Sequence, residues 1–184
     1  MPRIPALKRK HMDSDQKNIF DRITSDNGRI GFGPAIGYAY SAFVWDLHNL
    51  SSGHLLKCSL TNSQVRIISL LTVKHWNSRY PWSAQARTAL GAGLSSQIIE
   101  SINKGVTPTF ETEEDLSVYS VTKELLTTGD LSDDEFQSAT KILGYKRMSE
   151  IVHTIGHFTT TGLMANLVGC KPPDDAISRL ECRN

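Results

Sequence analysis

Histidine and threonine side chains recur on one face of an expected C-terminal helix, and they suggest acid–base chemistry. His153, His157 and Thr161 are spaced four residues apart, with Thr160 and Met164 beside them. Residues three or four apart share a helix face, so these side chains point the same way. The opposite stripe is apolar and consists of Ile151, Val152, Ile155, Phe158 and Leu163. Because imidazole titrates near neutral pH, His157 is the first candidate for a general acid or base. The alternative is that this face meets solvent or a neighbouring subunit.

His153 and His157 also form an H-x-x-x-H pair, a spacing that can bind zinc from one helix face. No acidic third ligand accompanies the pair in the sequence. We therefore predict no metal site and no cofactor.

Further candidates lie in the middle of the chain. His75 continues the helical stripe of Val65 and Ile68, so it points inward, either as a core histidine or as an assisting acid or base. Arg79 can hold a substrate carboxylate, and Tyr80 can donate a proton to an enolate oxygen. A surface arginine and a packed tyrosine are the alternatives for these two residues.

The elements that carry these residues are all expected to be helices. Capping residues and apolar stripes at helical spacing predict helices that begin near residues 13, 38, 61, 81, 95, 112, 132 and 146. The capping-box pattern Thr61-x-x-Gln64 precedes an almost wholly apolar segment, which indicates a buried central helix. About seven or eight helices with short connections predict an all-α bundle.

The chain of 184 residues suits a single domain over 1–184. Residues 1–12 are expected to form an extended arm, and residues 172–184, after Pro172-Pro173, a loose tail. A glycine-rich loop over 27–34 has no phosphate-binding pattern, and we interpret it as a turn that lets the backbone pass close to a pocket edge.

Composition excludes several classes of function. The formal net charge is +1, which gives no field to hold nucleic acid or an anionic membrane. No apolar run approaches the length of a spanning helix and no signal peptide is recognisable, so we expect a cytoplasmic protein. None of Cys58, Cys170 and Cys182 belongs to a C-x-x-C pair, which argues against a dithiol redox centre.

The segment from His75 to Ser95 reads HWNSRYPWSAQARTALGAGLS, and it resembles a signature of the carboxymuconolactone decarboxylase family. The resemblance continues at Arg3-Ile4-Pro5, over 122–126 and 131–136, and over 150–159 with Leu167. It implies the alkyl hydroperoxidase D-like fold, assembled as a homo-oligomer, a trimer or a hexamer. It also implies one of two chemistries, thiol-based peroxide reduction or metal-free decarboxylation and isomerisation.

The sequence departs from that signature where the family carries a proton relay. The family's Glu and His, four residues apart on one helix, are replaced here by Pro81 and Gln85. Glutamine can only donate and accept hydrogen bonds, so the usual relay is not carried over.

We therefore expect a cofactor-free lyase or isomerase that acts on a small enolisable lactone, keto acid or related metabolite. Gln85 and Arg79 would orient substrate oxygens and His157 would move the proton, assisted by Tyr80 or His75. Trp82, His153 and Thr161 complete the expected site. The alternative is a non-catalytic protein that binds a small molecule or supports an assembly. Peroxidase activity is disfavoured because no C-x-x-C pair is present.

Overall fold

The computed structural model describes residues 2–25 and 31–181, and every regular element in these ranges is helical. The sequence predicted about seven or eight helices, and in the described residues a short 3-10 turn (Arg9–His11) precedes eight α-helices. They are α1 (Ser14–Ser25), α2 (Ala35–Tyr38), α3 (Ala42–Leu55), α4 (Asn62–His75), α5 (Arg79–Gly91), α6 (Ser96–Lys104), α7 (Glu113–Thr128) and α8 (Asp133–Val168). No described helix has the length and apolar character needed to cross a membrane.

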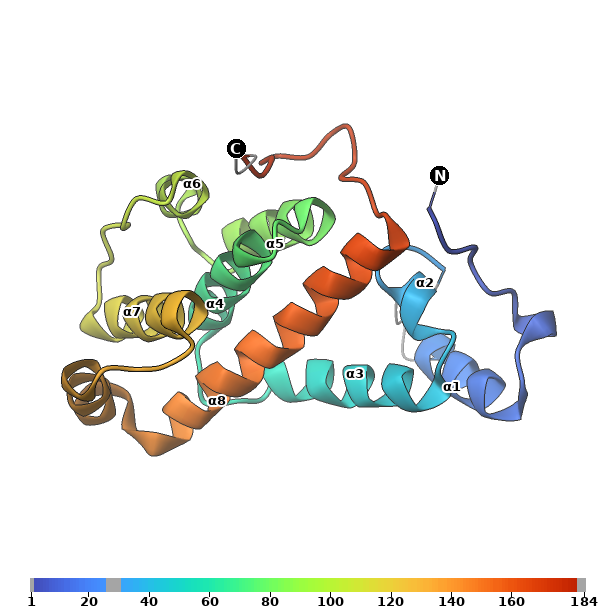
Figure 1. Cartoon of the computed structure of the whole chain (residues 1–184), viewed down its shortest axis with the longest axis horizontal. Helices are drawn as coiled ribbons and strands as arrows, with labels where there is room; N and C mark the ends of the chain where they lie inside the picture. Colours follow the sequence, from blue (N-terminus) through green and yellow to red (C-terminus); the bar gives the residue numbers. More distant parts are fainter. Residues whose placement is uncertain (1, 26–30, 182–184) are drawn as a thin grey trace.

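Helix α8 crosses the middle of the molecule and separates two groups of helices (Figure 1). Helices α4 to α7 lie on one side, and α1 and α2 lie towards the other end. Gly144 breaks α8 with a φ of 71° and a ψ of 162°, a conformation that glycine adopts without steric cost. The long straight part therefore begins close to residue 146, where the sequence predicted the last helix to begin.

The larger core is built around α4, which contacts α5, α7 and α8. The predicted capping box is present, since Thr61 accepts from the Gln64 amide and Gln64 accepts from the Thr61 amide. Ile67, Ile68 and Leu70 are buried completely or nearly so, and burying such a side chain contributes about 1.5–3 kcal/mol. Helix α4 is thus the buried central helix that the sequence indicated.

A smaller core joins α1, α2 and α3, with Met12, Ile23, Tyr38, Ala39 and Trp45 buried in it. Helix α2 packs so closely on α8 that a Cβ atom on Gly37 would overlap the Met164 side chain. The two cores are therefore distinct, and the space between α2, α3 and α8 lies at their boundary.

The C-terminal segment differs from the loose tail that we predicted over 172–184. Within the described part, Leu180 is buried in the larger core. The indole Nε1 of Trp82 donates to Ser178 Oγ at 3.0 Å, and Asn103 donates to the Arg179 carbonyl at 2.9 Å. The backbone amide of Glu181 also donates to the Asn103 side chain. Pro172-Pro173 ends the helix as expected, but these contacts then attach the chain to α5 and α6.

Candidate active site

A cavity of about 390 Å³ lies where the two cores meet, a volume in the usual range of small-molecule sites. Helices α2, α3, α4, α5 and α8 all contribute to its wall. Its polar lining residues are Tyr38, His48, Asn49, Ser52, Arg66, Tyr80, Gln85, His157 and Thr161. Pro81 and Gln85, which replace the Glu and His of the family signature, both face this cavity.

Three rings stack along one side of the cavity. The His48 ring lies between Tyr38 and His157, with centroid distances of 4.1 Å and 4.5 Å. The planes of the two imidazoles differ by only 13°. Helix α3 supplies His48 and α8 supplies His157, so the packing of these two helices places two imidazoles face to face.

Both stacked imidazoles are held in the neutral form. Burial lowers the pKa of His48 to about 4. Burial also lowers the pKa of His157 to about 3, assisted by the positive charges that His48, His153 and Arg66 would place nearby. A neutral imidazole has one donor and one acceptor nitrogen, so each ring can accept a proton on one nitrogen.

Arg66 gives the cavity a half-buried positive charge. Its Nη1 donates to Gln85 Oε1 at 2.7 Å, and no carboxylate pairs with it among the described residues. Burial lowers the pKa of Arg66, yet a guanidinium remains protonated in proteins. A half-buried cation that no carboxylate of the described residues neutralises favours the binding of an anion.

Tyr38 lines the same space. Its hydroxyl is buried and makes no hydrogen bond of normal geometry among the described residues. Burial raises the pKa of Tyr38 to about 12, and the nearby Thr161 hydroxyl offsets part of that rise. The phenol therefore stays protonated at neutral pH.

The glycine-rich loop approaches the cavity as the sequence predicted, over its described part 31–34. Phe32 and Pro34 line the cavity. Gly33 has a φ of 60°, and a Cβ atom there would lie 2.7 Å from the Tyr80 hydroxyl. Glycine is therefore needed at this position for the loop to pass over the Tyr80 ring. Residues 27–30 of the predicted loop lie outside the described residues.

Of the residues predicted from the sequence, the structure brings together Tyr80, Gln85, His157 and Thr161. The others lie outside this cavity. His75 packs against the Trp76 ring and faces a separate hollow beside α7. Arg79 is exposed, and Trp82 is buried in the larger core. His153 faces an outer groove between α3 and α8.

Three further residues line the cavity and were not predicted from the sequence: Arg66, His48 and Tyr38. Arg66 interrupts the almost wholly apolar pattern of α4, and a lone arginine on a buried helix was a signal that could have been used. His48 shares a helical stripe with Trp45 and Leu55, so it too was recognisable as an inward polar residue. No local pattern indicated that Tyr38 would face a cavity.

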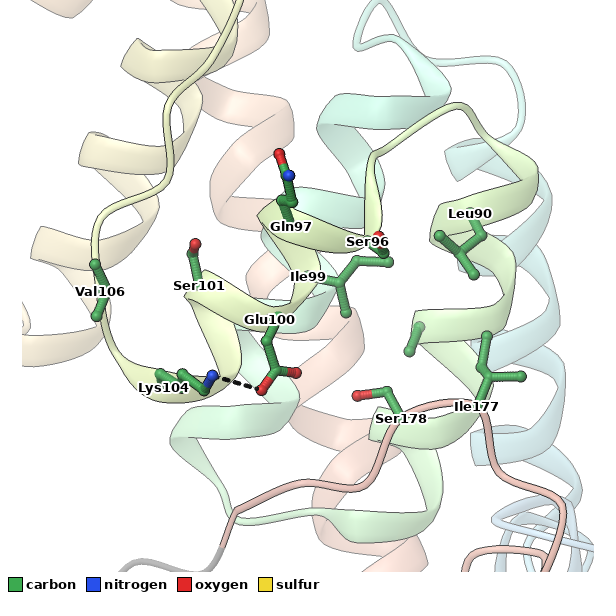
Figure 2. A pocket seen from close by; sticks show the side chains of 11 residues that line it. Leu90, Ser96, Gln97, Ile99, Glu100, Ser101, Lys104, Val106, Ile177 and Ser178 are labelled. Atoms are coloured by element: carbon green, nitrogen blue, oxygen red, sulfur yellow. Dashed lines mark ion pairs between the residues drawn. The ribbon is translucent and has the colours of Figure 1, made fainter.

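A larger open groove of about 540 Å³ lies between α5, α6 and the C-terminal segment. Figure 2 shows Leu90, Ile177 and Ser178 on one side and Lys104 and Glu100 on the other. The two charged residues pair with each other at 3.3 Å along α6 and are about half exposed. This groove therefore lacks the unpaired charge and the half-buried imidazoles of the smaller cavity. Across the described residues, no three His, Cys, Asp or Glu side chains form a metal-binding group.

The two neutral imidazoles should make the fold sensitive to acid. The pKa of histidine in an unfolded chain is about 6.5, above the folded values of about 4 for His48 and about 3 for His157. Above pH 6.5 neither state is charged at these rings. As the pH falls below 6.5, only the unfolded chain gains protons, so the free energy of unfolding decreases.

We expect a loss of roughly 4 kcal/mol between pH 7 and pH 5, measured by urea unfolding. His157→Gln should remove about half of this pH dependence. Ser52→Ala, which alters the cavity wall without removing a titrating ring, should retain all of it. A free energy of unfolding that stays level from pH 7 to pH 5 would contradict the burial of these rings.

The chain matches no protein-family model and no curated protein. Solved structures do resemble it. An AhpD core from Ralstonia eutropha, an uncharacterized peroxidase-related protein, aligns with a TM-score of 0.71 over 95% of this chain and 93% of its own, at 12% identity. A protein of unknown function from Agrobacterium tumefaciens, described as a candidate antioxidant defence protein AhpD, aligns with a TM-score of 0.65 at 19% identity. That alignment covers 78% of this chain and 100% of the other. The chain has the AhpD-like fold.

The AhpD-like fold is the one that the resemblance to the decarboxylase signature implied. At 12% and 19% identity these likenesses establish the fold, and the activity depends on which side chains line the cavity.

Proposed function

We propose that this AhpD-like chain is a cofactor-free lyase or isomerase that uses acid–base chemistry on a small enolisable carboxylate, such as a keto acid or a lactone carboxylate. The observation that carries this proposal is the combination of groups in one cavity. Arg66 supplies a cation without a carboxylate partner among the described residues, and His48 and His157 supply neutral imidazoles.

Arg66 and Gln85 would bind the substrate carboxylate. Because Arg66 donates to Gln85 Oε1, the amide is oriented with its Nε2 as the remaining donor. Guanidinium and amide donors together match the oxygens of a carboxylate. Gln85 thus keeps the orienting role that we expected from the sequence, while Arg66 takes the carboxylate-binding role that we had assigned to Arg79.

In a decarboxylation, the bond between the carboxylate carbon and the α-carbon breaks and carbon dioxide leaves. The electron pair passes into the neighbouring carbonyl as an enolate, and the α-carbon then takes up one proton. The Tyr38 hydroxyl, which stays protonated and lacks a partner of normal geometry in the described part of the chain, would donate to the enolate oxygen. His157 would deliver the proton.

A bound anion would change the pKa of His157 only in part. Burial is the largest cause of the low pKa of His157, and the charge of Arg66 contributes least among the causes. A carboxylate beside Arg66 would cancel that contribution alone, so His157 would stay neutral with the substrate bound.

Thiol-based peroxide reduction fits this chain poorly, although one similar solved structure is named as peroxidase-related. Peroxide reduction by a thiol pair needs a second cysteine within disulfide reach, and the sequence contains no C-x-x-C pair. Burial raises the pKa of the Cys170 thiol, which lowers the fraction of reactive thiolate.

The proposal predicts selective binding of small carboxylates. Thermal unfolding against a panel of β-keto acids, lactones and phenolic acids should show an increase in Tm for carboxylate members, because a ligand at a hundredfold excess over its Kd stabilises by about 2.7 kcal/mol. The methyl esters of the same compounds serve as controls and should give little shift. Equal shifts with acids and esters would remove Arg66 from substrate binding.

We also propose that the chain forms a homo-oligomer, a trimer or a hexamer, as the family resemblance implied. Large apolar side chains remain exposed at Phe43 on α3 and at Leu163 and Leu167 on α8, and exposed apolar surface often marks an interface. Light scattering should then give a mass that is a multiple of 20.4 kDa, whereas a mass of 20.4 kDa would rule the assembly out.

A further inference from the structure

Ser51 on α3 bridges two histidines of α8. Its Oγ lies 2.9 Å from Nδ1 of His157 and 3.0 Å from Nε2 of His153. His157 lines the cavity, whereas Ser51 and His153 line an outer groove of about 710 Å³ on the other side of this contact. The hydroxyl therefore connects a half-buried imidazole of the candidate active site with an exposed imidazole at the surface.

We propose that Ser51 is a proton relay, which passes protons between His157 in the cavity and His153 at the surface. Its purpose rests on the acid–base function proposed above. Each decarboxylation consumes one proton, whereas an isomerisation can return the same proton to its substrate. A proton path to the surface is therefore expected of a decarboxylase, which takes up one proton in each turnover, more than of an isomerase.

Each proton that leaves one atom in this transfer is taken up by another named atom. His157 gives its Nε2 proton to the substrate carbon, and at the same time its Nδ1 accepts the Ser51 hydroxyl proton. Ser51 Oγ then takes the Nε2 proton of a cationic His153, which becomes neutral. His157 and Ser51 each lose one proton and gain one, and water at the surface reprotonates His153. Neutral His157 can therefore act as an acid without first becoming an imidazolium ion.

A relay needs one ring inside the site and one ring at the surface, and His157 and His153 lie in two such surroundings. His157 faces His48, Tyr38 and Arg66 across the cavity, and burial keeps it neutral with a pKa of about 3. His153 packs edge-on against His54 at 5.3 Å. Lys146 and Glu150 share its groove, and Glu150 accepts from the amide and hydroxyl of Ser59.

A relay makes a prediction about tautomers that does not depend on any activity. When His153 is cationic, its Nε2–H must donate to Ser51 Oγ. The single hydroxyl hydrogen of Ser51 then points to Nδ1 of His157, so neutral His157 must carry its own hydrogen on Nε2. Nitrogen chemical shifts of ¹⁵N-labelled histidine report both the charge of His153 and the tautomer of His157.

We expect His157 to be almost wholly in the Nε2–H form once His153 is protonated, in the native chain and in the control Ser52→Ala. Ser52 donates to the His48 carbonyl at 2.9 Å and contacts neither nitrogen of the relay. Ser51→Ala keeps both rings and their charges, and it should lose this tautomer preference. Ser51→Thr, which restores a hydroxyl, should regain it.

The relay is overturned if His157 keeps its hydrogen on Nδ1 while His153 is cationic, or if Ser51→Ala has the same tautomer populations as the native chain. The tautomer measurement tests the relay, and the carboxylate-binding measurement tests the proposed function, so the two can fail independently. Carboxylate binding without tautomer coupling would leave the proposed function and remove the relay. Tautomer coupling without binding of any carboxylate would do the reverse.

Discussion

His157→Gln is expected to reduce turnover of the accepted carboxylate by about 100- to 10,000-fold, the usual contribution of a general acid or base. Glutamine retains a polar side chain of similar reach but cannot accept and release a proton. The substrate is still held by Arg66 and Gln85, which pair with each other at 2.7 Å. We therefore expect kcat to fall while KM changes little.

His54→Gln is the matched control for this prediction. His54 lies on α3 and packs edge-on against His153, but it does not line the cavity. Its replacement should leave kcat within a fewfold of the native value. A His157→Gln variant that turns over at the native rate would show that another group, such as His48, moves the proton.

Arg66→Gln should weaken carboxylate binding by about 10- to 150-fold, because a hydrogen bond to a charged group is worth about 1.5–3 kcal/mol. Glutamine can still donate to the Gln85 amide, but it supplies no charge. Calorimetric titration of the native chain and the variant with the same ligand gives the ratio of the two Kd values. Arg66→Lys retains the charge without the planar fork, so its loss should be smaller.

Arg87→Gln controls for the removal of any arginine. Arg87 is exposed on α5 and pairs with Asp175 at 3.3 Å. Because Arg87 does not line the cavity, its replacement should not change the Kd of the carboxylate. Equal affinities of the Arg66→Gln variant and the native chain would show that the anion binds elsewhere.

Much of the fold could be predicted from local sequence patterns. The capping box at Thr61 and Gln64 and the apolar run after it identified α4 as a buried helix, because both signals act within a few residues. The attached C-terminal segment was harder to predict. The attachment depends on Asn103 and Trp82, which lie far away along the chain.

The candidate site was predicted only in part for a similar reason. His157 and Thr161 were found because they repeat on one helix, and Gln85 because of its place in the family signature. The other residues of the site lie on helices that carry neither pattern: Arg66 is on α4, and His48 and Ser51 are on α3. Their partnership with Gln85 and His157 exists only after α3, α4, α5 and α8 pack together.

Proton NMR in D₂O tests most directly whether this cavity performs acid–base chemistry on a carboxylate. The native chain and His157→Gln would be incubated with each β-keto acid and lactone carboxylate that raises Tm. We predict that the native chain releases carbon dioxide from, or exchanges the α-proton of, at least one compound. Deuterium should appear on the α-carbon, and His157→Gln should slow this reaction strongly. A carboxylate that binds through Arg66 but shows neither loss of carbon dioxide nor exchange would contradict the claim and make the chain a binding protein.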